Sequence, residues 1–467
     1  MERRRFLSTF VGATSVALAG CAAFSGEDGV LFEGDPDRWP RPLHDPANTG
    51  RNPAANGPRE GMERDWVYEF DADVDGFFGE YSAPVVDEGT VYVVERWERL
   101  FDDENGEDAA HAHILAIDDT GTKRWVEEMG TGSGERFTRY GLTVDGNELV
   151  TARTYRQDDI PLTLTLDGLF EITRWDSETG DQIDKSALDE HWGPPTLADD
   201  RYFAVGREAI GEIDGAGIDV ERRYEDGTES DDDSDHFHGG VGFPPSVVDG
   251  TVYVSGMNRF LAIEPDANEP SWTIDAHEDL DELWGEDVIG SFYEPAVEEN
   301  RLYTTFGVPN PPWNNGDPDR SPERNGGVVA VDRNDGTIAW TWQQDVDDDW
   351  AGTAGCSPAI DEERVYVCGY SGVDDESVDE RLYALDKADG ELIWEQPIDG
   401  FAWAPVAGKE TVYVVGYDEV AAFDASSGDR LASDSLDEYT ADRAVPPAVV
   451  DGKLVVSTQT AVIAYEA

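Results

Sequence analysis

A repeating unit of roughly 50 residues, a length typical of repeat proteins, runs through most of the chain and constrains the fold more than any other feature. Its first half is clearest in the sequence PSVVDGTVYV at Pro245–Val254, and its second half at Leu382–Trp394. Comparable starts fall at Pro84, Leu142, Pro195, Pro245, Pro295, Pro358, Pro405 and Pro447. The chain therefore contains eight copies of one unit.

Each copy predicts four short strands. Valine, isoleucine and tyrosine alternate with polar residues along the predicted strands, and no long segment has the 3.6-residue period of a helix. Asp249-Gly250 and Asp389-Gly390 are typical hairpin turns, because glycine readily adopts positive φ. Four-stranded antiparallel units in a ring form a β-propeller. The sequence thus predicts an all-β, eight-bladed propeller.

The last copy stops after its third predicted strand, at 461–465. The segment Trp66–Phe70, ahead of the first copy, has the pattern of a fourth strand. We expect it to pair beside residues 461–465 and complete the last blade, which would leave the ring without an open edge.

The second half of the unit contains the motif Ala-x-Asp-x-x-x-Gly-x-x-x-Trp. It occurs at Ala330–Trp340 and Ala384–Trp394, and in a shortened form at Ala116–Trp125. With this motif the chain resembles the pyrroloquinoline-quinone (PQQ)-type propeller repeat family over residues 62–467. The resemblance implies that the motif tryptophans dock between neighbouring blades and are structural. These are Trp125, Trp272, Trp340 and Trp394.

The resembled family includes both quinone-dependent dehydrogenases and non-catalytic members, such as the propeller lipoprotein of the bacterial outer-membrane assembly machinery. In the dehydrogenases, adjacent cysteines cover the cofactor and calcium is bound. This chain has no Cys-Cys pair. The resemblance therefore favours a non-enzymatic binding or scaffold protein with no cofactor. One alternative is an oxidoreductase that uses PQQ with calcium, and another is a hydrolase or lyase in the propeller channel, for which no catalytic constellation is evident.

The N-terminus carries an export signal. Arg3–Leu7 matches the twin-arginine pattern, and an apolar run at 10–19 is too short to span a bilayer. The run ends in a lipobox-like Leu-Ala-Gly-Cys sequence, which predicts lipidation of Cys21. We expect twin-arginine export, a lipid anchor on the outer face of the cell membrane, and three regions. They are a signal peptide (1–20), a flexible tether and lead-in (21–61) and the propeller (62–467).

The charge indicates adaptation to high salt, as in a halophile. The formal net charge is −68, from 102 Asp and Glu against 34 Lys and Arg. At molar salt the Debye length is about 3 Å, so the repulsion between these charges is largely screened. The same charge makes nucleic acid a poor partner and leaves the lipid anchor as the expected contact with the membrane.

The predicted strands place a candidate binding surface on one face of the ring. The connections between strands one and two, and between strands three and four, are short and share the turn face. The other connections share the loop face and contain the long insertions, near 96–112, 155–167, 225–242, 308–326 and 371–380. Long loops on a rigid scaffold commonly bind ligands.

Aromatic and basic residues precede the inner strands at the loop-face mouth of the channel. They are Tyr81, Arg139, Tyr140, Trp192, His238, Phe243, Tyr293, Trp403 and Arg443. Such residues suit a protein or a small organic or anionic ligand, although they could equally plug the channel mouth.

Two further patterns leave alternatives open. His111 and His113, like His236 and His238, are spaced to share one face of a strand, but both pairs lie in acidic loops and match no recognised metal motif. No metal is therefore expected.

If Asp361–Glu363 is a three-residue hairpin loop, Ile360 opposes Arg364, and Cys356 opposes Cys368. The two cysteines could then form a disulfide, or remain two buried free thiols.

Overall fold

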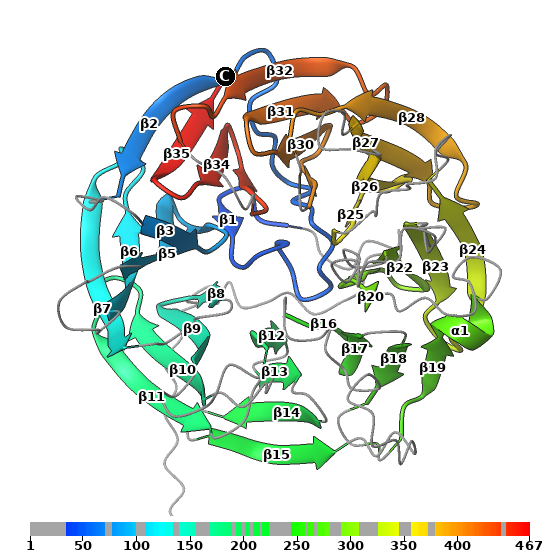
Figure 1. Ribbon diagram of the computed structural model, residues 1–467, viewed down its shortest axis with the longest axis horizontal. Coiled ribbons are helices and arrows are strands. Elements are labelled where there is room, and N and C mark those ends of the chain that lie inside the picture. The colour runs from blue at the N-terminus through cyan, green and yellow to red at the C-terminus, as the bar shows by residue number, and fades with distance from the viewer. Residues whose placement is uncertain are drawn as a thin grey trace, which may run out of the picture.

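Eight antiparallel sheets stand around a central channel and form an eight-bladed propeller (Figure 1). This computed structural model describes residues 34–70, 77–99, 109–133, 140–155, 169–188, 193–198, 201–205, 209–214, 217–223, 244–256, 259–264, 267, 269–280, 291–307, 326–344, 356–371, 379–400, 402, 404–439 and 445–467. Blade 1 consists of β4 (Val85–Asp87), β5 (Thr90–Arg99), β6 (Ala109–Ile117) and β7 (Lys123–Ser133), and blade 2 of β8 (Tyr140–Asp145), β9 (Glu148–Tyr155), β10 (Leu169–Asp176) and β11 (Gln182–Leu188). Blade 3 consists of β12 (Thr196–Ala198), β13 (Arg201–Val205), β14 (Ala209–Asp214) and β15 (Gly217–Arg223), and blade 4 of β16 (Ser246–Val248), β17 (Thr251–Ser255), β18 (Arg259–Ile263) and β19 (Trp272–Asp275).

The remaining blades follow the same order from the channel outwards. Blade 5 consists of β21 (Ala296–Val297), β22 (Arg301–Gly307), β23 (Gly327–Asp332) and β24 (Ile338–Gln343), and blade 6 of β25 (Ala359–Ile360), β26 (Arg364–Ser371), β27 (Asp379–Asp386) and β28 (Leu392–Pro397). Blade 7 consists of β29 (Val406–Ala407), β30 (Thr411–Val415), β31 (Glu419–Asp424) and β32 (Arg430–Ser435), and blade 8 of β33 (Ala448–Val450), β34 (Lys453–Ser457), β35 (Ala461–Glu466) and β2 (Glu63–Glu69). Short strands β1 (Arg38–Trp39), β3 (Phe77–Tyr81) and β20 (Ser291–Phe292) extend blades 1 and 5, and α1 (Ala276–Asp279) follows β19. No helix within the described residues is long and apolar enough to cross a membrane.

The ring closes as the sequence predicted. Strand β2 pairs antiparallel with β35, with Trp66 opposite Ala464 and Tyr68 opposite Val462. Each of the eight predicted starts directly precedes, or lies within, the innermost strand of a blade. The prediction of eight blades and of the closing strand is therefore confirmed.

Tryptophans and glycines hold neighbouring blades together. The Trp340 Nε1–H of blade 5 donates to the Lys387 carbonyl of blade 6 at 3.0 Å, and its ring packs on Gly390. Gly390 has φ +77°, and a Cβ there would lie 2.6 Å from the Trp340 ring. The corresponding Nε1–H donors and carbonyl acceptors are Trp125 and Ser177, Trp272 and Arg333, and Trp394 and Ala425. These rings are therefore part of the contact between blades.

Residues 34–60, here called the N-terminal plug, fill the turn-face end of the channel. The side chains of Trp39, Leu43, Asn48 and Asn52 are fully buried. The prediction of a flexible lead-in through residue 61 was therefore wrong from residue 34 onwards. The segment lacks helix or strand periodicity because its backbone bonds to the blades around it rather than to a neighbouring strand of its own.

The plug contacts all eight blades. Strand β1 pairs with β4 of blade 1, and the Arg41 Nη2 group donates to Thr196 Oγ1 of blade 3 at 3.0 Å. The other six blades each donate a backbone N–H of the first strand, or of the turn that follows it, to a plug carbonyl. These donors are Val144, Val247, Val297, Ile360, Ala407 and Asp451. All these contacts lie near the connections between the first and second strands, so the plug closes the channel at the turn face.

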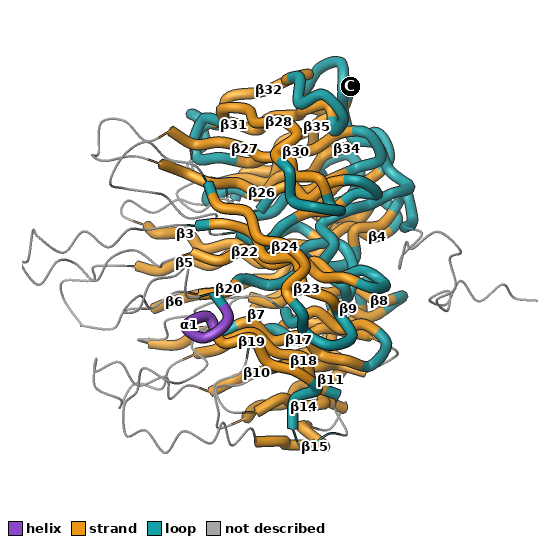
Figure 2. The backbone as a smooth tube through the Cα atoms, turned by 90° about the vertical axis from the view of Figure 1, so that its right-hand side faces the viewer, coloured by secondary structure: helices purple, strands orange, loops and turns teal. Residues whose placement is uncertain are grey.

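The two faces differ in the side view. Figure 2 shows most of the loops and turns of the described residues, in teal, at the right of the ring, and strands β5, β6 and β27 extending to its left. The plug leaves the channel along the turn face, where the Tyr413 hydroxyl donates to the Pro58 carbonyl at 3.2 Å. It then joins β2 at the outer rim.

Candidate functional site

The structure describes three of the nine residues predicted at the channel mouth: Tyr81, Tyr140 and Tyr293. Tyr81 ends β3 opposite Glu95, and Tyr140 begins β8 opposite Arg153. The Tyr293 N–H donates to the Thr305 carbonyl. All three positions lie at the loop-face ends of inner strands, in blades 1, 2 and 5. Arg139, Trp192, His238, Phe243, Trp403 and Arg443 lie outside the described residues.

Backbone contacts fix the position of Tyr293. Its carbonyl accepts hydrogen bonds from Ser255 Oγ at 2.7 Å and Thr304 Oγ1 at 2.6 Å. Ser255 belongs to blade 4 and Thr304 to blade 5, so Tyr293 is anchored between two blades. Its side chain is partly exposed, while hydrogen bonds from two blades hold its backbone in place.

Beneath the loop face, blade 2 contains a charged triad that sequence reasoning missed. Arg153 Nε lies 2.7 Å from Glu171 Oε1, and Lys185 Nζ lies 2.6 Å from Glu171 Oε2. Arg153 and Glu171 face each other across β9 and β10 and are both buried. A buried carboxylate between two cations is compensated, so the triad is a structural ion cluster. The triad could not be predicted from the sequence without the pairing register of β9 and β10, which places residues 18 positions apart opposite each other.

The histidine pairs do not gather further ligands within the described residues. His113 Nδ1 lies 3.3 Å from Glu95 Oε1, the residue directly opposite it on β5. His111 lies on the same strand, β6, while His236 and His238 are outside the described residues. Across the described ranges, no three His, Cys, Asp or Glu side chains are grouped to hold a metal ion.

Cys356 and Cys368 are neighbours but are unbonded and buried. The predicted register was wrong: Ile360 opposes Val365, not Arg364. The Asp361 carboxylate accepts the N–H groups of Glu363 and Arg364 and tightens the turn to two residues.

The sulfur of Cys356 nevertheless contacts the second cysteine. The Cys368 N–H donates to Cys356 Sγ at 3.3 Å, and the Cys356 thiol donates to the Cys368 carbonyl at 3.4 Å. Burial, together with the neighbouring Cys356 thiol, raises the pKa of Cys368 well above its ordinary value. Both groups therefore remain thiols in this structure, and the disulfide stays a prediction.

A hollow of about 730 Å³ lies on the turn face, between the plug and blades 5 and 6. Sequence reasoning missed it, because one wall comes from the segment interpreted as a tether. The lining is rich in charge. It includes the basic residues Arg51, Arg301, Arg364 and Lys387 and the acids Asp45, Glu298, Glu299, Asp361, Glu362, Glu363 and Asp386.

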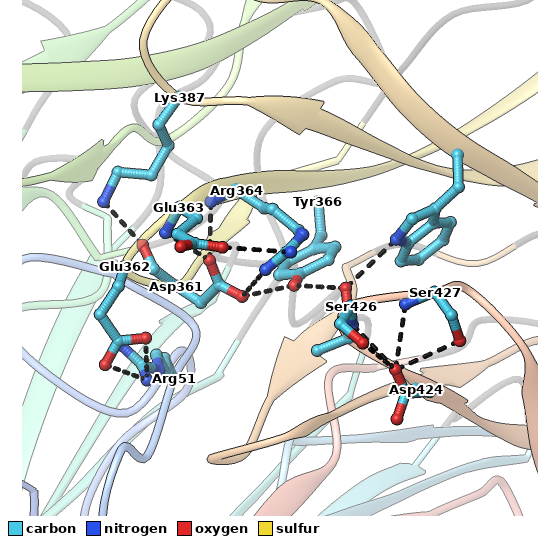
Figure 3. A network of polar contacts seen from close by, with 12 residues as sticks. Arg51, Asp361, Glu362, Glu363, Arg364, Tyr366, Lys387, Asp424, Ser426 and Ser427 are labelled. Atoms are coloured by element: carbon cyan, nitrogen blue, oxygen red, sulfur yellow. Dashed lines mark hydrogen bonds and ion pairs between the residues drawn. The ribbon is translucent and has the colours of Figure 1, made fainter.

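The basic groups of the hollow are already bonded, and Figure 3 shows contacts of Arg51, Arg364 and Lys387. Arg51 Nη2 of the plug donates to both oxygens of Glu362, at 2.7 and 2.6 Å. Lys387 Nζ bonds to Glu298 and, at 2.6 Å, to the Asp361 carbonyl. Arg301 Nη1 donates to the Lys387 and Ala388 carbonyls. These contacts join the plug to blade 6, and blade 6 to blade 5.

Burial raises the pKa of two side chains beside the hollow. It raises the pKa of Glu298 above the ordinary range, although the Lys387 ammonium acts in the opposite direction. It also raises the pKa of Tyr366, whose hydroxyl donates to Asp361 at 2.5 Å. Tyr366 is therefore a hydrogen-bond donor rather than a phenolate. No described group pairs a nucleophile with a base here, so the arrangement is best explained as a set of interblade clamps.

Comparisons with known proteins identify the family. No curated protein matches the chain. Among solved structures, a quinohemoprotein alcohol dehydrogenase from Comamonas testosteroni is 13% identical, with 92% of this chain and 80% of that chain covered and a TM-score of 0.58. Sqt1 from Saccharomyces cerevisiae is 9% identical, with 88% and 96% covered and a TM-score of 0.46. At these identities the likeness to the dehydrogenase shows the fold alone.

A family model described as outer membrane protein assembly factor BamB matches residues 170–467. The match covers more than half of the chain and agrees with the PQQ-type repeats and the eight blades. The chain therefore belongs to the PQQ-like propeller family represented by that model.

Proposed function

We propose that this protein is a non-enzymatic binding scaffold, exported by the twin-arginine route and anchored through lipidated Cys21 to the outer face of the cell membrane. It binds a protein or a small organic ligand at the loop face of the propeller. No cofactor takes part in this function.

The closed turn-face end of the channel carries the proposal. Because the plug bonds to all eight blades, the described residues close the channel at the turn face, and we expect a ligand to enter from the loop face. The blades beneath that face are rigid, as the anchoring of Tyr293 and the buried triad at Glu171 indicate. A rigid ring with long loops on one face suits recognition of a partner.

The family adds support for a protein partner. The matching model is described as an outer membrane protein assembly factor, which is a role in assembling other proteins. Aromatic residues offer a large contact area at low entropic cost, and arginine offers bidentate bonds to carboxylates. The predicted mouth residues are of these two kinds.

Substitution of the predicted channel-mouth residues by alanine tests the proposal. The triple variant Trp192→Ala, Trp403→Ala and Arg443→Ala should lose the partner that cross-linking and mass spectrometry identify with the wild-type protein. A matched variant with Asn147→Ala and Asp389→Ala, both in short turns, should retain it. Thermal unfolding in molar salt would verify that both variants fold. Equal loss of the partner in the two variants would contradict binding at the loop face.

A second measurement addresses the oxidoreductase alternative. The purified protein would be incubated with PQQ and calcium and then supplied with alcohols or sugars and an electron-accepting dye. We expect no dye reduction above the rate without protein. Quinone-dependent reduction would replace the scaffold proposal with a dehydrogenase.

A further inference from the structure

The chain enters the plug on the turn face of the ring. The Pro36 carbonyl accepts the Asp451 N–H at 2.7 Å, and Asp451 begins the turn between β33 and β34. Arg38 Nε lies 2.5 Å from the carboxylate of Asp87, which ends β4 at the equivalent turn of blade 1. The first described residues are therefore attached to the turns of blades 8 and 1.

The chain is also held where it leaves the plug. Asn52 is fully buried, and its Nδ2 donates to the Asp35 carbonyl at 2.8 Å and to the Val449 carbonyl at 3.3 Å. Further along, Lys453 Nζ bonds to Asp65 at 2.5 Å at the start of the closing strand. Both ends of the plug are therefore held at the turn face.

The distance from the predicted anchor is limited. Cys21 precedes Asp35 by 14 residues, and a fully extended chain of that length spans at most about 50 Å. A lipid attached to Cys21 would therefore hold Asp35, and the turn face with it, within about 50 Å of the bilayer. Asp249 and Glu362 on that face are paired with Arg333 and Arg51. The net charge of −68 opposes tight docking on anionic lipids, so the short chain, and not a basic patch, sets the distance.

We propose that the turn face is the membrane-proximal face and that the loop face is presented away from the membrane. This orientation rests on the proposed lipidation of Cys21. It assigns the two faces different tasks: the turn face connects the ring to its anchor, and the loop face remains accessible to a partner in the surrounding medium.

Energy transfer to the membrane tests the orientation. A donor dye on Asn147→Cys would report on the turn face, and one on Asp437→Cys on the loop face, because residue 147 follows β8 and residue 437 follows β32. Both positions are exposed, whereas the native Cys356 and Cys368 are each only 2% exposed and would react poorly. The full-length lipidated protein would be placed in vesicles that contain an acceptor-labelled lipid, in molar salt. We expect severalfold more efficient transfer from residue 147.

A second pair of labels and an anchor variant complete the experiment. Asp389→Cys on the turn face and Asp418→Cys on the loop face should repeat the difference, which protects against one variant failing to fold. Vesicle binding with equal transfer from both faces, or stronger transfer from the loop face, would overturn the orientation alone. Absence of vesicle binding by the protein with intact Cys21 would overturn the proposed anchor as well. Cys21→Ser should abolish transfer from every label.

Discussion

At the scale of single residues, the propeller depends on positions where a side chain from one blade meets the backbone of the next. Gly390 is one of them, because its φ of +77° and its contact with Trp340 both exclude a larger residue. Gly250 has nearly the same φ, +76°, but nothing lies within 4 Å of a Cβ built there. The two glycines therefore separate the cost of the backbone conformation from the cost of crowding between blades.

Gly390→Ala should destabilise the protein more than Gly250→Ala. The left-handed conformation costs alanine about 1–2 kcal/mol at either position. At residue 390 the new methyl group would also displace the Trp340 ring, and overpacking typically costs another 1–3 kcal/mol. Denaturant unfolding in molar salt measures both. Equal losses would show that the tryptophan contact is not tightly packed.

The stability of the folded protein should depend on pH through the side chain of Glu380. Burial, with Asp399 and Asp418 nearby, raises its pKa to about 7, above the value of about 4.3 expected in the unfolded chain. The folded state therefore binds the proton more tightly, and stability falls as pH rises from about 4 to 7. Glu380→Gln should remove this fall, as measured by unfolding midpoints at pH 5 and pH 8 at constant salt. The same difference between the two pH values in wild type and variant would contradict the assignment.

At the scale of elements, the N-terminal plug acts as a ninth component of the ring. It is neither helix nor long strand, and its bonds go to the first strand, or to the turn after it, in every blade. Burial of Trp39 and Leu43 adds apolar contacts at the channel end. Loss of the plug would therefore weaken all the blades together, because each would lose a contact with the same segment.

Asn52→Ala should lower the free energy of unfolding by about 1–3 kcal/mol, because it removes a buried donor that bonds to three carbonyls, of which that of Val449 is buried. The Asn52 amide bonds to the carbonyls of Asp35, Arg38 and Val449. Asn147→Ala, at an exposed turn, is the matched control and should change stability by no more than about 0.5 kcal/mol. Similar stability of the two variants, by denaturant unfolding, would mean that the plug is not tightly coupled to the ring.

At the scale of the whole molecule, the net charge determines how the stability of the fold depends on salt. The net charge is −68, while most described ion pairs, such as Arg381 with Glu395 and Arg430 with Glu419, include partly exposed side chains. Pairs of this kind contribute about 0–1 kcal/mol each and cannot offset so large a repulsion in dilute solution. The stability of the ring therefore depends on the salt around it.

The protein should lose its fold in dilute buffer and regain it in molar salt, where the Debye length falls to about 3 Å. Circular dichroism and tryptophan fluorescence during a salt titration would follow both changes. Sucrose at matched water activity is a suitable control, because it lacks the screening ions. Full stability at low ionic strength would contradict adaptation to salt.

The sequence by itself determined the features that repeat. Hairpin glycines, alternating valines and the motif tryptophans act within one blade or between adjacent blades, so their spacing predicted eight blades, and the missing last strand predicted closure by Trp66–Phe70. Only the tertiary structure decided the plug, the hollow and the hairpin register near Cys356. The plug depends on bonds to eight separate blades, Arg51 meets Glu362 across more than 300 residues, and the Asp361 side chain shortens its own turn. Contacts of these kinds leave no periodic pattern, because each is made once. The partners of the plug and of the hollow also meet only after the ring has closed, whereas the Asp361 contact depends on the side-chain geometry of a single turn.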